Sequence, residues 1–220
     1  MSVLFVTGTD TGVGKTFVAC ALALAFRAAG HRVGVMKPVE TGVVDQPEDA
    51  LRLAAAAGDR APLDEICPYR LRAPLAPSVA AAGEGVVINV ERLLRAIARR
   101  AAGVDVLLVE GAGGLLVPIV GATTFLDLAV QATLPVLLVG ANRLGTVNHC
   151  ALNARVAGAA GLDVRGFVLS QPTLHADESS TTNAEVVATL AGLRCRGVLP
   201  HLPDPAAAAA LLEIDDLVGG

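Results

Sequence analysis

The sequence predicts an α/β fold in which a mostly parallel sheet is flanked by helices. Short runs rich in β-branched residues and leucine recur along the 220 residues, and longer alanine-rich runs with helical spacing lie between them. Strands buried on both faces read as continuous apolar runs, so this alternation indicates βαβ units wound around one sheet. Because 53% of the residues are hydrophobic, one core is within reach, and we expect a single domain over residues 1–220.

The strands are predicted in chain order at 3–7, 32–37, 105–110, 135–140 and 164–170. Helices are expected over 16–29, 90–102, 147–160 and 182–190. The alanine clusters at 54–57 and 206–210 are also expected to be helical, because alanine is the strongest helix former.

Residues 38–88 depart from the alternation. Prolines interrupt this segment and leave room for no long element apart from a short helix near 48–57; they are Pro38, Pro47, Pro62, Pro68, Pro74 and Pro77. We therefore expect a loop-rich insertion, and long loops in compact domains are often functional.

Composition argues against several classes of function. The formal net charge is −4 without a basic block, and aromatic residues make up 3% of the chain, which leaves little for a nucleic-acid surface. We expect a small-molecule or protein partner. No apolar run reaches the ~18–20 residues that span a bilayer, and no signal peptide is recognised, so a cytoplasmic chain without a membrane partner is expected.

The cysteines and histidines suggest no metal site, disulfide framework or catalytic triad. Cys20, Cys67, Cys150 and Cys195 lack the spacings of zinc sites and are expected to be buried small hydrophobes. The histidines, His31, His149, His175 and His201, are equally scattered.

The segment GTDTGVGKT, residues 8–16, has the residues and the context of a phosphate-binding loop. A predicted strand precedes it and a predicted helix follows. Gly12 and Gly14 permit a tight turn that presents backbone N–H groups, Lys15 would bring a charge to the phosphates, and the Thr16 hydroxyl would reach magnesium. Five residues separate Gly8 from Gly14, whereas the common pattern has four. The alternative is a glycine-rich turn with a solvated lysine.

Charged residues end two of the other predicted strands. Lys37 ends the second strand and Glu110 the third, at the sheet edge where open α/β folds bind ligands. A lysine at the end of a buried strand is costly unless it meets an anion. Glu110 stands where phosphate-loop enzymes hold a metal with an acid, although it could instead cap a turn. Asp49 is a weaker metal candidate, because it could equally cap the short helix.

Four segments, GTDTGVGKT, KPVETG, VEGAGGLLVP and LGTVNH, occur in the order in which they occur in dethiobiotin synthetases, and the resemblance to that family covers nearly all of the chain. The longer loop spacing is a property of the family. The resemblance implies a P-loop NTPase-like fold and ATP-dependent ring closure in biotin biosynthesis. CO2 would add to an amine of 7,8-diaminopelargonate, ATP would phosphorylate the carbamate to a carbamic-phosphoric anhydride, and the neighbouring amine would close dethiobiotin with release of ADP and phosphate.

The resemblance also implies roles for individual residues. Lys15 and Lys37 are the implied catalytic residues, one at the phosphates and one at the carbamate and the transferring phosphoryl group. Thr16, Asp49 and Glu110 would hold Mg2+. The implied nucleotide contacts are Thr11, Gly12, Val13, Gly14, Lys15, Thr16, Ser170, Gln171, Pro200, His201 and Leu202, and the implied substrate contacts include Thr11, Lys37 and Thr41.

Two positions depart from the family pattern. Gly12 stands where some members carry glutamate, so a side-chain contact from such an acid is absent. The segment VLSQPTL, residues 168–174, stands where members that select adenine have an asparagine. Ser170 and Gln171 are the candidates to replace it, and the base preference stays open.

The segment NRLGTVNH, residues 142–149, is predicted to open a helix, and the free N–H groups of a helix start can hold a carboxylate. In the family the corresponding helix start holds the carboxylate tail of the substrate across a homodimer interface. The implied tail contacts are Leu144, Gly145, Thr146, Val147 and Asn148. The alternative is a glycine and an asparagine that merely cap a helix.

Two other classes of nucleotide-binding protein match the sequence less well. Amidotransferase-type cobyrinate synthases share a similar nucleotide domain but add a glutaminase domain, for which 220 residues are too few. Partitioning and septum-positioning ATPases usually carry a second lysine early in the loop, where this chain has Thr9 and Asp10. The residues after Leu212 also lack the basic or amphipathic pattern of a membrane tail.

Overall fold

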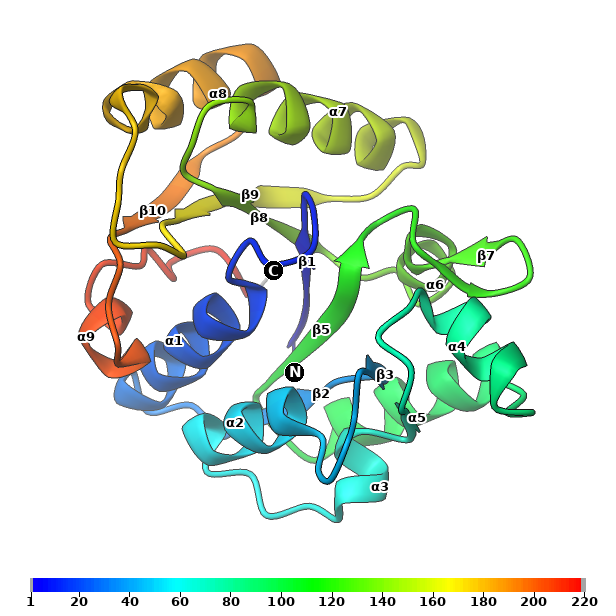
Figure 1. Cartoon of the computed structure of the whole chain (residues 1–220). Coiled ribbons are helices and arrows are strands. Elements are labelled where there is room, and N and C mark those ends of the chain that lie inside the picture. Colours follow the sequence, from blue (N-terminus) through cyan, green and yellow to red (C-terminus); the bar gives the residue numbers. More distant parts are fainter. Residues whose placement is uncertain (1, 219–220) are drawn as a thin grey trace.

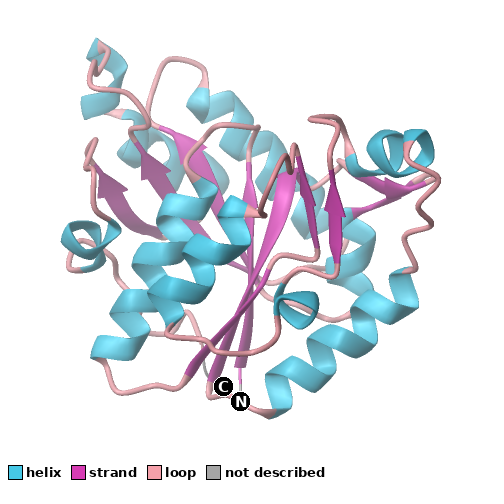
Figure 2. Ribbon diagram, turned by 60° about the horizontal axis from the view of Figure 1, so that its bottom comes forward, coloured by secondary structure: helices cyan, strands magenta, loops and turns pink. Residues whose placement is uncertain are grey.

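A parallel sheet covered by helices on both faces forms the centre of the computed structural model, which describes residues 2–218 (Figures 1 and 2). In these residues the sheet has six strands in the order β10-β9-β8-β1-β5-β2. The strands are β1 (Ser2–Gly8), β2 (Val33–Met36), β5 (Val106–Gly114), β8 (Val136–Ala141), β9 (Val164–Ser170) and β10 (Cys195–Leu199). The predicted fold class is confirmed.

The two faces of the sheet carry separate hydrophobic clusters. Successive side chains of a strand point to opposite faces, and in β1 Leu4 and Val6 join one cluster while Phe5 joins the other. The first cluster is covered by α1 (Lys15–Ala28), α2 (Glu48–Ala57) and α9 (Pro205–Ala209), and the second by α5 (Val90–Ala102), α6 (Phe125–Gln131), α7 (Thr146–Ala159) and α8 (Asn183–Ala191) (Figure 1). A short 3-10 helix, η1 (Glu178–Thr181), precedes α8.

All five predicted strands and the four long predicted helices are present, with most ends within one residue of the expectation. The main difference is β5, which continues through its glycines to Gly114. Neither β10 nor α6 was predicted. The run CRGVL of β10 is short and contains Arg196 and Gly197, so it lacks the apolar continuity of the other strands.

The insertion at 38–88 contains only short elements besides α2, as expected. They are β3 (Val39–Thr41), α3 (Leu63–Ile66), β4 (Tyr69–Leu71) and α4 (Pro77–Gly83). Pro47 and Pro62 stand at the N-caps of α2 and α3, and Pro77 opens α4. Prolines therefore stand at helix starts here, and Pro77 does so in the first turn, which suits its fixed φ. After the insertion, β6 (Pro118–Val120) and β7 (Thr123–Thr124) form a small antiparallel pair.

Three of the four cysteines are buried, as expected, whereas Cys195 is only half-buried. That expectation was wrong for Cys195 because it lies in β10, a strand at the edge of the sheet. Within residues 2–218, no helix is both long and apolar enough to cross a bilayer.

The other edge strand, β2, is covered by a buried ion pair. The Asp59 carboxylate accepts the N–H of Val35 at 2.9 Å, and the Arg100 guanidinium donates to the carbonyl of Val35 at 2.9 Å. Asp59 and Arg100 also pair with each other, with side chains 9% and 8% exposed. The pair thus occupies backbone groups that an unprotected edge would offer to another chain.

Replacing Asp59 by alanine is expected to lower the free energy of unfolding by about 3–5 kcal/mol, because it leaves the Arg100 charge buried without its partner. Urea unfolding followed by far-UV circular dichroism measures this change. The control is Glu91→Ala, which removes the exposed partner of Arg95 and should leave the unfolding midpoint nearly unchanged. Equal effects of the two substitutions would contradict the role given to the buried pair.

Candidate active site

The glycine-rich loop between β1 and α1 has a backbone that requires glycine. Gly12 and Gly14 have φ values of +73° and +89°, in the left-handed region that glycine adopts most readily. A Cβ on Gly14 would also lie 2.6 Å from Oγ of Ser170. α1 begins directly after Gly14 without a side-chain cap, so the N–H groups of its first turn are available to an anion.

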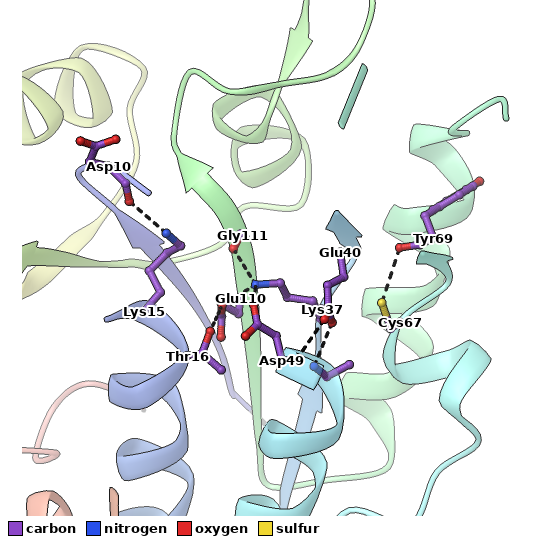
Figure 3. Close-up of polar contacts among 11 residues, drawn as sticks. Asp10, Lys15, Thr16, Lys37, Glu40, Asp49, Cys67, Tyr69, Glu110 and Gly111 are labelled. Atoms are coloured by element: carbon purple, nitrogen blue, oxygen red, sulfur yellow. Dashed lines mark hydrogen bonds and ion pairs between the residues drawn. The ribbon is translucent and has the colours of Figure 1, made fainter. Parts of the chain in front are cut away.

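Lys15 is buried beside this loop without an acidic partner. Its ammonium donates to the carbonyl of Asp10 at 3.0 Å (Figure 3), and no ion pair of Lys15 is found within residues 2–218. Burial, and to a lesser extent the nearby charge of Lys37, lowers the pKa of Lys15 to about 8. A phosphate group would supply the negative charge that this ammonium lacks.

Lys37, directly after β2, meets two carboxylates. Its Nζ lies 2.5 Å from Oε1 of Glu110 and 2.9 Å from Oδ2 of Asp49 (Figure 3). Burial by itself lowers the pKa of Lys37, but attraction to Glu110 and Asp49 outweighs burial and raises the pKa above its ordinary value. These two carboxylates of the chain itself balance the charge of the buried lysine.

Lys15 and Lys37 are the only lysines among the 17 basic residues of the chain. Both are buried, with 8% and 3% of their surface exposed. An ammonium is a compact and strongly hydrated charge, so its burial needs a reason. The placement of both lysines at one site is consistent with a site for anions.

The donor groups around Glu110 fit a magnesium ion. Thr16 donates its hydroxyl to Oε1 of Glu110 at 2.9 Å, while Oε2 of Glu110 is buried without a hydrogen-bond partner. Burial raises the pKa of Asp49, but the charge and hydrogen bond of Lys37 outweigh it, so Asp49 is a carboxylate. Among the described residues no three His, Cys, Asp or Glu side chains cluster as a metal cage. Magnesium typically takes only one or two carboxylates and completes its shell with water and phosphate oxygens.

Glu40, which the sequence analysis did not single out, lies behind Asp49. It is buried, and its two carboxylate oxygens each accept a backbone N–H at 3.0 Å, from Asp49 and Ala50 (Figure 3). Burial raises the pKa of Glu40, and the two backbone hydrogen bonds offset part of that rise. Its signal was present in KPVETG, as a second charge beside Lys37.

These groups share one pocket of about 800 Å³. Its polar floor includes the predicted residues Thr11, Gly12, Gly14, Lys15, Thr16, Lys37, Thr41, Asp49 and Glu110. Apolar residues from other segments form a wall, namely Pro74, Leu75, Pro77, Ala112 and Val117. The pocket can therefore take a ligand with anionic groups at one end and a hydrocarbon portion beside them.

The residues expected near the nucleotide base lie on the other side of the loop. Lys37 follows β2 and Glu110 lies within β5, whereas Ser170 ends β9, beyond β8 in the sheet. Ser170 is buried against Gly14. The N–H of Gln171 donates to the carbonyl of Leu199, which places Gln171 beside the segment that contains Pro200, His201 and Leu202. None of these five residues lines the main pocket.

The predicted tail residues form a separate hollow at the start of α7. Leu144, Gly145, Val147 and Asn148 line a pocket of about 400 Å³ together with residues of α7 and α8, while Thr146 is buried beneath it. Asp177 stabilises the segment 144–148, because its carboxylate accepts the N–H of Leu144 at 2.7 Å. Within one chain this hollow does not join the main pocket.

Gly14→Ala is expected to destabilise the protein more than Gly12→Ala. Both substitutions place a side chain at positive φ, at a cost of about 1–2 kcal/mol. Only the new Cβ at position 14 would also overlap with Ser170, because the space around Gly12 is open. The added steric cost is roughly 1–3 kcal/mol. Chemical denaturation of both variants measures the difference, and equal losses would contradict the close packing of Ser170 on the loop.

Comparisons with known proteins agree with this geometry. A family model described as AAA domain matches residues 2–209. An ATP-dependent dethiobiotin synthetase BioD from Anaeromyxobacter dehalogenans (strain 2CP-C) is 47% identical over 210 residues, which cover 95% of this chain and 94% of that protein. Proteins of the same name from Aquifex aeolicus (strain VF5) and Bacillus thuringiensis (strain Al Hakam) are 42% and 41% identical, covering 87% and 91% of this chain and 86% and 84% of their own lengths.

Among solved structures, a chain of the MinC:MinD cell division protein complex from Aquifex aeolicus aligns with 92% of this chain and 82% of its own length, at a TM-score of 0.57. Their sequences are 13% identical, so this likeness shows a shared P-loop NTPase-like fold and nothing about function. The identities of 41–47% over most of both chains carry more weight. These identities show that the chain belongs to the ATP-dependent dethiobiotin synthetase family.

Proposed function

We propose that this chain closes the ureido ring of dethiobiotin from 7,8-diaminopelargonate, CO2 and ATP. Membership of the family makes it an ATP-dependent ligase of biotin biosynthesis. The specific ring-closing reaction is supported by one observation: a polar floor lies beside an apolar wall in one pocket, and the floor brings together Lys15, Thr16, Lys37 and Glu110. Because the reaction consumes ATP, we place it in the cytoplasm.

The residues of the floor suit a reaction whose participants are anionic. Lys15 and the free N–H groups of α1 would hold the phosphates of ATP, and Lys37 would neutralise the carbamate and the phosphoryl group that it receives. Thr16, Asp49 and Glu110 would hold Mg2+, which when bound supplies further neutralisation of phosphate charge. Catalysis then consists of positioning and charge neutralisation, and needs no side-chain nucleophile.

In the proposed chemistry a carbamate oxygen takes the γ-phosphoryl group of ATP and ADP leaves. The second amine then attacks the carbonyl carbon of the mixed anhydride, the bond from that carbon to the phosphate oxygen breaks, and inorganic phosphate leaves with the ring closed. The proton lost by the amine passes to phosphate or water. Thr11 and Thr41, which line the pocket, are proposed to orient the diamine and the phosphates by hydrogen bonds.

We propose a homodimer in which the second copy supplies the site for the carboxylate tail of the substrate. The hollow formed by residues 144–148 is separate from the main pocket of its own chain. Leu144, Leu152 and Leu190 around it are 81%, 52% and 52% exposed, and contact with a partner would bury this apolar surface. The N–H groups at the start of α7 would then face the carboxylate.

The residues proposed to border the nucleotide base lie outside the pocket that would hold the triphosphate. Ser170 has its hydroxyl against Gly14, while His201 is exposed and Gln171 is half-buried. We propose that Ser170, Gln171, Pro200, His201 and Leu202 border the base, with the backbone groups of this segment as its hydrogen-bond partners.

Phosphate release from the purified protein with magnesium and ATP tests the function directly. The assay is run with and without 7,8-diaminopelargonate and bicarbonate, dethiobiotin is followed by mass spectrometry, and CTP and GTP replace ATP in parallel. We expect release that requires the diamine and yields dethiobiotin. Release indifferent to the diamine, with no dethiobiotin formed, would reject the proposal.

Lys37→Ala is expected to retain nucleotide binding within a few-fold and to lose at least about 100-fold in kcat, because its charge is needed where the transition state develops negative charge. Since Glu110 and Asp49 would lose their cation, Lys37→Arg is measured beside it. The arginine keeps the charge and the fold but not the geometry of an ammonium, so it should also lose kcat. Full turnover in either variant would contradict the role of Lys37.

Asn148→Ala is expected to raise the Michaelis constant for the diamine about tenfold with little change in that for ATP, because the substitution removes a polar group from the tail hollow. Initial rates at varied diamine measure the effect. Asn153→Ala is the control, since Asn153 lies on the same helix and bonds only the carbonyl of His149. An Asn148→Ala variant that matches this control would reject the tail site.

A further inference from the structure

The helix that carries Asp49 has no cap of its own. Pro47 occupies the N-cap of α2, and no side chain from that position bonds the first turn. The first N–H groups of a helix have no partner inside the helix and are costly to bury unpaired. Asp49 is in this first turn, so its position depends on whatever else satisfies those groups.

Glu40 satisfies them from another element. Its Oε1 accepts the N–H of Asp49 and its Oε2 the N–H of Ala50, both at 3.0 Å. The side chain comes from β3, which is paired with β4 so that Glu40 stands opposite Arg70. Glu40 is 6% exposed, and two bonds to one carboxylate fix its orientation.

We propose that Glu40 is a positioning residue that sets Asp49 against Lys37 and thereby fixes the cation-binding corner of the pocket. The inference rests on the proposed function, in which Asp49 holds the metal. The path consists of direct contacts: Glu40 holds the backbone of Asp49, the Asp49 carboxylate bonds Lys37 at 2.9 Å, and Lys37 bonds Glu110. The insertion would thus act on the chemistry through the contact of Glu40 with the backbone of Asp49.

Hydrogen exchange in the ligand-free protein tests the contact itself. In Glu40→Ala the amides of Asp49 and Ala50 lose their acceptor, so their exchange should accelerate at least tenfold while amides of the central sheet keep their protection. Asn89→Ala is the matched control, because Asn89 caps α5 through the N–H of Arg92, and its loss should leave the amides of α2 unchanged. Unchanged exchange at Asp49 in Glu40→Ala would overturn the proposal.

Cation binding, measured apart from turnover, tests the consequence. Mn2+ in the presence of ADP is titrated by electron paramagnetic resonance, and Glu40→Ala should raise the dissociation constant of Mn2+ about 10–100-fold, as expected when a group that orients a ligand is lost. Glu40→Gln keeps one acceptor oxygen and should recover part of the loss. If Glu40→Gln has normal amide exchange but loses as much Mn2+ affinity as Glu40→Ala, the charge of Glu40 acts on the cation directly. That result would overturn the proposal that Glu40 positions Asp49.

A double-substitution cycle with Asp49 decides whether Glu40 acts through that residue. In an Asp49→Ala background, adding Glu40→Ala should change the Mn2+ constant less than twofold, because the group to be positioned is gone. A full additional loss would overturn the proposal. Amide exchange and Mn2+ binding are both measured without forming dethiobiotin. If the predicted changes in both are observed but the ring-closing assay fails, the proposed function is rejected and the positioning role of Glu40 stands.

Discussion

One buried ammonium, that of Lys37, holds the site together. It joins β2 to Glu110 on β5, 73 residues away in sequence, and to Asp49 on α2, while Glu110 in turn accepts the hydroxyl of Thr16 from α1. Burying the charges of Lys37 and Glu110 is costly unless they satisfy one another, and the half-buried Asp49 adds a second anion. Each member therefore depends on the others, and contacts within the chain itself hold the polar floor in a fixed arrangement, which is the condition for electrostatic stabilisation without reorganisation.

The order of the strands makes this meeting possible. β1 lies between β5 and β8, and β5 lies between β1 and β2 (Figure 1). All of these strands run parallel, so the ends that carry the loop, Glu110 and Lys37 reach the same edge. From β1 the chain passes to β2 and β5 on one side of that strand and later to β8 on the other. The loop after β1 therefore lies at a switch point, where open α/β sheets have a crevice.

Much of this arrangement was predictable from the sequence, and the exceptions share a physical cause. Lys37 and Glu110 stand directly after strong apolar runs, so a parallel sheet dictates where they meet. Glu40, Asp59 and Arg100 act on backbone groups that lie 9, 24 and 65 residues away, outside any local turn. A hydrogen bond to a distant backbone leaves no residue pattern, because any sequence offers the N–H and carbonyl groups. The strand β10 was missed for a related reason, since pairing with β9 rather than its own composition makes it a strand.

The confinement of both lysines to the pocket gives the protein an unusual chemical surface. Its exposed positive charge comes from arginine, and Lys15 and Lys37 are nearly inaccessible. Guanidinium groups do not react with the acylating agents that modify amines, so the α-amino group aside, such agents meet no side-chain amine on the outside of the folded chain. Acylation of a lysine would then report an opened pocket.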